Sequence, residues 1–142
     1  MKAEEVNLYI IVADDDMQAH ALIKKAVSEC GLNHIVTSVY NGLQLMNLLL
    51  GKGFYKTDGL RLPDAIILDL KMQVMDGFEV LEKIKGLEKF KNIPVYVLSG
   101  SHSSRDKKKS EELGAKGFYT KPVNYARLAK TVMEICNSAQ KK

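Results

Sequence analysis

Apolar and polar residues follow two different patterns along this chain, and these patterns predict its strands and helices. Short, nearly continuous apolar runs are typical of strands buried on both faces of a parallel sheet. Between these runs, apolar residues recur every three to four positions, as they do in amphipathic helices. We expect strands at 8–13, 35–39, 65–70, 94–99 and 117–119, and helices at 17–30, 43–50, 78–87, 104–113 and 124–139.

The regular alternation of strands and helices predicts the architecture. Strand-helix units joined by short links form doubly wound α/β sheets that are parallel and have helices on both faces. A length of 142 residues is typical of one domain, here 1–142 with a core of about 7–136. The link at 51–63 is longer than usual and contains three glycines, so we expect a surface loop there.

Acidic residues follow two of the expected strands directly. Asp14-Asp15-Asp16 comes after the first strand, and Asp69 comes near the end of the third. Ligand sites in such sheets lie at the carboxyl ends of the strands, and clustered carboxylates repel one another unless a cation is present. Hard oxygen ligands favour Mg²⁺ or Mn²⁺. The alternative is that the acidic triplet only caps the next helix, although one aspartate would suffice for that.

Two further residues, together with Asp69, extend this site toward phosphoryl chemistry. Asp69 is a candidate nucleophile, because a carboxylate can attack a phosphoryl group to form an acyl phosphate. Ser99 ends the fourth strand and can donate a hydrogen bond to a phosphoryl oxygen. Lys121 follows the fifth strand and can supply a fixed positive charge. A cis peptide bond before Pro122 would direct the lysine side chain inward.

Composition excludes several other classes of protein. The net charge of +4 could indicate nucleic-acid binding, but the lysines are scattered and no DNA- or RNA-reading motif is present, so we expect no nucleic-acid partner. No apolar run is long enough to span a membrane. The first residues lack the basic and apolar regions of a signal peptide, so we expect a cytoplasmic protein that does not bind membranes.

The ordered set of these residues resembles the receiver domain of two-component response regulators. The resemblance extends from about residue 7 to residue 135. Each motif alone is weak evidence for the family. Together, in this order and between these strands, the motifs are specific to it. The matching positions are Asp14-Asp15, Asp69, Asp76-Gly77, Ser99-Gly100, Gly114-Ala115 and Lys121-Pro122.

The resemblance implies a flavodoxin-like fold with five strands in the order 2-1-3-4-5 and five helices. It also implies phosphotransfer from a histidine kinase to Asp69. The required Mg²⁺ would be held by Asp15, Asp69 and the backbone carbonyl of Lys71, with Asp14 acting through water.

The sequence departs from the family at several positions. Phe118 occupies the aromatic switch position, which turns inward as the hydroxyl residue moves, but it lacks the hydroxyl of the frequent tyrosine. Gln73 replaces a common proline, so we expect a less rigid loop with an intact site. Ser99 replaces the more frequent threonine and keeps the hydroxyl. The helix at 104–113 is more polar than usual.

We therefore expect a stand-alone phosphorylation switch, a phosphoprotein of a two-component system or phosphorelay that catalyses only its own phosphorylation and dephosphorylation. Its partners would be a histidine kinase or phosphotransfer protein, and an unknown downstream protein that contacts the face formed by the fourth helix, the fifth strand and the last helix. A homodimer through that face is possible. The long loop resembles regulators that partner phytochrome-type kinases. Alternatives are a binding module that needs no phosphate and a phosphatase, which Lys71 disfavours because such enzymes place a second carboxylate there.

Overall fold

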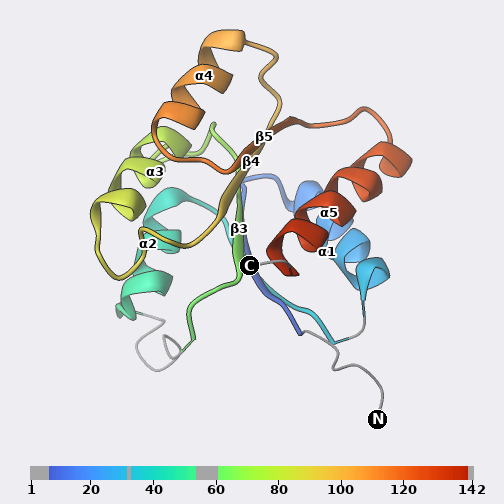
Figure 1. Ribbon diagram of the computed structural model, residues 1–142, viewed down its shortest axis with the longest axis horizontal. Helices are drawn as coiled ribbons and strands as arrows, with labels where there is room; N and C mark the ends of the chain where they lie inside the picture. The colour runs from blue at the N-terminus through green and yellow to red at the C-terminus, as the bar shows by residue number, and fades with distance from the viewer. Residues whose placement is uncertain (1–6, 32, 54–60, 141–142) are drawn as a thin grey trace.

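The computed structural model describes residues 7–31, 33–53 and 61–140. Five parallel strands form one sheet in the order β2-β1-β3-β4-β5, which confirms the predicted α/β fold (Figure 1). Strands and helices alternate along the chain. The strands are β1 (Tyr9–Ala13), β2 (Ile35–Val39), β3 (Ala65–Leu68), β4 (Val95–Ser99) and β5 (Gly117–Thr120). The helices are α1 (Met17–Cys30), α2 (Gly42–Leu50), α3 (Gly77–Gly86), α4 (Ser104–Glu112) and α5 (Tyr125–Gln140).

The sheet separates two halves of the apolar core. Successive side chains of a strand point to opposite faces, so Ile11 of β1 packs toward α2 and α3, whereas Ile10 and Val12 pack toward α1 and α5. Figure 1 shows α1 and α5 side by side on one face of the sheet, with the other three helices on the opposite face. Every β3 residue is buried, as expected for the strand in the middle of a covered sheet.

The chain turns sharply between β3 and α3, and Gly77 makes this turn possible. Its amide donates to the Leu70 carbonyl at 2.9 Å. A Cβ atom at this position would lie 2.5 Å from the Asp69 carbonyl oxygen, too close for any other residue. Asp76 then caps α3, in a reciprocal capping box with Glu79. Glycine is therefore required at position 77, where the start of α3 passes close to the backbone of Asp69, and Asp76 fixes the start of the helix.

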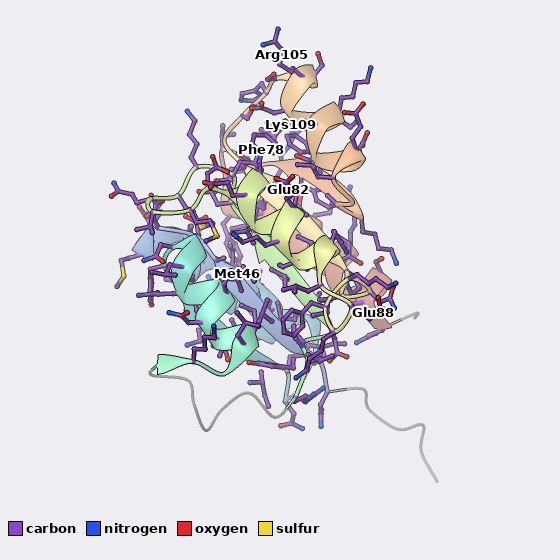
Figure 2. The ribbon with its side chains drawn as sticks, turned by 90° about the vertical axis from the view of Figure 1, so that its left-hand side faces the viewer. Met46, Phe78, Glu82, Glu88, Arg105 and Lys109 are labelled. Atoms are coloured by element: carbon purple, nitrogen blue, oxygen red, sulfur yellow. The ribbon has the colours of Figure 1, made fainter. Side chains whose placement is uncertain are left out.

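Helix α4 differs from the other helices in its packing. Figure 2 views the face covered by α2 and α3, with α4 above α3 at the top of the view. Ser110 is the one buried residue of α4, so few apolar contacts hold this helix. Its predicted polar character is thus evident in the fold.

Two further expectations concern long apolar helices and the long loop. In the ranges that the structure describes, no helix is long and apolar enough to cross a membrane. Of the predicted surface loop at 51–63, residues 54–60 lie outside the described residues.

Candidate functional site

Three carboxylates meet at the carboxyl ends of β1 and β3. The register pairs Ala13 with Leu68, and the amide of Asp69 donates to the Ala13 carbonyl at 2.9 Å. This pairing places Asp14 and Asp69 next to each other, each following its strand directly. Oxygen atoms of Asp14, Asp15 and Asp69 all lie within 4.8 Å of one another. Asp14 and Asp69 are buried, with 2% and 5% of their surfaces exposed.

Lys121 supplies the positive charge that faces these carboxylates. Its Nζ lies 2.8 Å from Oδ2 of Asp14 and 3.6 Å from Oδ2 of Asp69. The backbone holds this lysine in place, because its amide donates to the Ser99 carbonyl at 2.7 Å. Burial opposes the charge on Lys121, but its hydrogen bond to Asp14 and the nearby carboxylates outweigh burial and raise the pKa of the lysine.

The predicted cis peptide bond before Pro122 is wrong. None of the peptide bonds in the described part of the chain is cis. The trans form of an X–Pro bond is the more stable by about 0.5–1 kcal/mol. Lys121 reaches both carboxylates from a trans backbone, so the inward position of its side chain does not require the cis form.

Asp69 has an unusual environment for a carboxyl group. Burial, followed by repulsion from Asp14, raises its pKa to about 6, while Lys121 and the Lys71 amide act in the opposite direction. The Lys71 amide approaches Oδ1 of Asp69 at 3.4 Å. The positive charge of Lys121 therefore offsets only part of the negative charge of the three carboxylates. Three carboxylates with incomplete compensation provide the hard oxygen donors that a divalent cation prefers.

A cavity of about 440 Å³ adjoins the carboxylates. Ser99, at the end of β4, and Lys71 line this cavity together with Asp15. The Ser99 side chain is fully buried, and its Oγ accepts a hydrogen bond from the Ser101 amide at 3.3 Å. The Ser99 hydroxyl group and the Asp15 carboxylate thus border one opening.

Phe118 lies one strand away from this cavity. It pairs with Val97 across β4 and β5 and is half-buried against the core on the α2–α3 side. The side chain is therefore packed inward in this structure. Its role as a switch residue stays a prediction.

His20 was not identified from the sequence, although it contacts the acidic loop. Its ring is buried, and Nε2 donates a hydrogen bond to the Asp14 carbonyl at 2.7 Å. The ring also packs against Tyr40, with 4.6 Å between ring centroids. The available signal was helical spacing, because His20 lies on the same face of α1 as the buried residues Ile23 and Val27.

Ser101 and Asp106 were also missed, and they connect the cavity to α4. The Ser101 hydroxyl donates to Oδ2 of Asp106 at 2.7 Å, and the Thr120 hydroxyl donates to the Ser101 carbonyl at 3.2 Å. Helix α4 also contacts α3: Nζ of Lys109 lies 4.3 Å from the centre of the Phe78 ring (Figure 2). Both Phe78 and Asp106 line the cavity. Serine and aspartate near a helix start gave no sequence signal beyond capping.

Comparison with known proteins identifies the family of this chain. The model of the response regulator receiver domain matches residues 10–133, so the chain belongs to the receiver domain family of two-component signalling. Response regulator Rcp1 of Synechocystis sp. is 32% identical over 126 residues, which are 89% of this chain and 84% of Rcp1. The probable methanogenesis regulatory protein FilR2 of Methanothrix harundinacea is 32% identical over 128 residues, 89% of this chain and 81% of FilR2.

Solved structures agree with this assignment. The phosphorylated cyanobacterial phytochrome response regulator RcpA matches with a TM-score of 0.85 and 33% identity, covering 92% of this chain and 91% of that one. The Mn²⁺-bound form of Rcp1 matches with a TM-score of 0.82 and 32% identity, covering 90% of this chain and 91% of that one. The neighbour Rcp1 thus binds a divalent metal, and the carboxylates of Asp14, Asp15 and Asp69 here are close enough together to hold one.

Proposed function

We propose that this protein is a phosphorylation switch in which Asp69 accepts a phosphoryl group from a phosphohistidine of a histidine kinase or phosphotransfer protein. The observation that carries the proposal is the position of Asp69. It is buried at the end of the central strand, next to Asp14 and Asp15, and it faces Lys121. No simple capping role requires these four side chains together.

The chemistry assigns one task to each side chain. A carboxylate oxygen of Asp69 attacks phosphorus, the bond from phosphorus to the donor histidine breaks, and the imidazole leaves with the electron pair. Ser99 and Lys121 donate hydrogen bonds to the transferred oxygens. Asp15, Asp69 and the Lys71 carbonyl would hold a Mg²⁺ or Mn²⁺ ion, with Asp14 in support. When bound, this ion neutralises charge on the phosphoryl oxygens.

Phosphorylation would alter the face formed by α4, β5 and α5. An aspartyl phosphate adds further negative charge to a cluster that is already acidic. The hydrogen bonds from Ser101 to Asp106 and from Thr120 to Ser101 link the cavity to α4 and β5, so a movement of Ser99 toward the phosphoryl group would reach both elements. Phe118, also on β5, would then respond to the movement of Ser99. A downstream protein would recognise the altered face.

The likeness to RcpA supports a phytochrome-type kinase as the donor. Lys71 stands where a phosphatase of this chemistry would place a second carboxylate, so we do not propose turnover of other phosphate esters.

The test is phosphorylation of the wild type, Asp69→Asn and Asp69→Ala. Each protein is incubated with acetyl phosphate and Mg²⁺, and separately with a panel of autophosphorylated histidine kinases that includes a phytochrome-type kinase. We expect the intact mass to show one phosphoryl group on the wild type only. The matched control is Asp16→Asn, which changes a carboxylate of the same acidic run that caps α1 and lies outside the three-carboxylate cluster, and which should accept phosphate normally. Labelling that survives both changes at Asp69 would contradict the proposal.

A further inference from the structure

The loop between β3 and α3 contains an unfavourable backbone conformation at Val74. Its φ is +69°, in the left-handed region that glycine and asparagine tolerate and that β-branched residues disfavour. The Met75 amide donates to the Gln73 carbonyl at 2.7 Å, closing a three-residue turn around Val74. Turns of this kind with positive φ are rare and strained.

The Val74 side chain gains little within this protein to offset that strain. It is 74% exposed, so its apolar surface is largely in contact with water. Asparagine or glycine would fit the same turn with less strain. An exposed valine at this position therefore lowers the stability of the free protein and contributes little packing in return.

The surroundings of Val74 indicate what could bury it. Gln73 and Asp76, on either side of Val74 in the chain, line the cavity beside Asp69. The other acidic loop, which carries Asp14 and Asp15, continues into Met17, whose surface is 70% exposed. Each of the two loops that bring the carboxylates together thus also presents an exposed apolar side chain.

We propose that Val74, together with Met17, is a recognition residue that the phosphohistidine-bearing domain of the donor kinase covers during phosphotransfer. This inference rests on the proposed function. Because only 5% of the Asp69 surface is exposed, a donor histidine on another protein must enter the cavity, and the protein surface around that histidine must cover the loops that frame it. A small phosphodonor enters without touching them.

The test compares a small donor with a protein donor. Val74→Asn and Val74→Gly relieve the turn and remove the apolar side chain, whereas Val74→Ile keeps both the strain and the apolar surface. Met17→Gln removes the second contact. The control is Ile35→Asn, which changes an exposed apolar residue at the start of β2, the opposite end of the sheet from the carboxylates.

We expect acetyl phosphate to label every variant at the wild-type rate. With the kinase that labels the wild type fastest in the panel above, kcat/KM should fall about 5- to 30-fold for Val74→Asn, Val74→Gly and Met17→Gln, chiefly through KM. Val74→Ile and Ile35→Asn should transfer normally. Thermal unfolding should show Val74→Asn and Val74→Gly to be at least as stable as the wild type.

Three results would overturn this inference. Equal kinase transfer to the wild type and Val74→Asn would show that no donor surface uses the valine. An equal loss of phosphorylation rate with acetyl phosphate and with the kinase would show that Val74 only shapes the site. A change in self-association on sedimentation, with transfer unaltered, would assign the two side chains to a second copy of the chain. Failure of the proposed function is distinguishable, because the wild type itself would then accept no phosphate from acetyl phosphate.

Discussion

The surroundings of the Asp69 side chain disfavour its charged form. Burial and the adjacent Asp14 raise its pKa to about 6, against an ordinary value of 3.8. The neutral form is therefore favoured in the folded protein more than in the unfolded chain. A group of this kind gains from any cation that enters the site, which links its reactivity to metal binding.

This pKa shift predicts how stability depends on pH in the absence of metal. Between about pH 4 and pH 6 the folded protein binds more protons at Asp69 than the unfolded chain does, so the contribution of Asp69 to stability is present below this window and is lost as the pH rises through it. Asp69→Asn removes the titration. We expect urea unfolding in EDTA to show the variant more stable than the wild type by about 1–3 kcal/mol at pH 7.5.

At pH 4.5 this difference should fall to about a third, because Asp69 is then mostly protonated in the folded protein but still mostly ionised in the unfolded chain. The control is Asp16→Asn, which exchanges one effective helix cap for another and should change little at either pH. A stability difference between Asp69→Asn and the wild type that is the same at both values of pH would contradict the assigned cause.

At the scale of elements, α4 is the helix whose position depends most on polar contacts. Ser110 is its buried residue, and its hydroxyl donates to the Asp106 carbonyl at 2.8 Å within the helix. The side-chain contacts that leave the helix include those of Asp106 with Ser101 and of Lys109 with Phe78. A helix with so little apolar burial opens at low free-energy cost, which suits an element that must respond to phosphorylation.

Hydrogen exchange should show this weakness directly. We expect the amides of α4 to exchange faster than those of α1 and α5, whose apolar faces pack together against the sheet. Asp106→Ala removes the link to Ser101 and should increase exchange in α4 further, with little effect on α1.

Glu111→Ala, which changes an exposed position near the other end of α4, is the matched control and should leave the exchange pattern nearly unchanged. Uniform acceleration across all helices in Asp106→Ala would show that the aspartate supports the whole fold instead of this one helix.

At the scale of the whole molecule, the carboxylate cluster joins segments that are distant in the sequence. Asp14 follows β1 and Asp69 follows β3, and the parallel pairing of these central strands brings them together. Lys121 arrives from the end of β5, at the edge of the same sheet. An ion bound there would stabilise the folded state alone, since the unfolded chain has no such site.

Mn²⁺ should therefore raise the unfolding temperature of the wild type. At a concentration about 100 times the Kd, the expected gain in the free energy of unfolding is about 2.7 kcal/mol. Asp15→Asn should abolish most of this gain while leaving the metal-free stability nearly unchanged, because Asp15 is exposed. Calorimetry with and without Mn²⁺ measures both quantities.

Asp106→Asn, which changes a carboxylate that lines the cavity but lies outside the three-residue cluster, should keep the gain. If Mn²⁺ stabilised Asp15→Asn as strongly as the wild type, the ion would not be bound by this cluster.

The pattern of apolar and polar residues was enough to predict the order of the elements and the fold class. Apolar runs with carboxylates at their ends specify buried parallel strands, and a parallel sheet gathers those ends at one edge whatever its side chains are. Asp14, Asp69 and Ser99 could therefore be placed together without coordinates. Helix ends were accurate to within one or two residues, because capping residues such as Asp16 and Asp76 act locally.

Which atoms contact one another could not be predicted from this pattern and became known from the folded structure. The closer pairing of Lys121 with Asp14 than with Asp69, the trans bond before Pro122, the bond from His20 to the Asp14 carbonyl and the strained turn at Val74 all depend on strand register and packing between distant segments. Hydrophobic periodicity records which face of an element is buried, but it contains no information on distances between elements. Those distances are set jointly by the whole core, so they become defined only when the chain is folded.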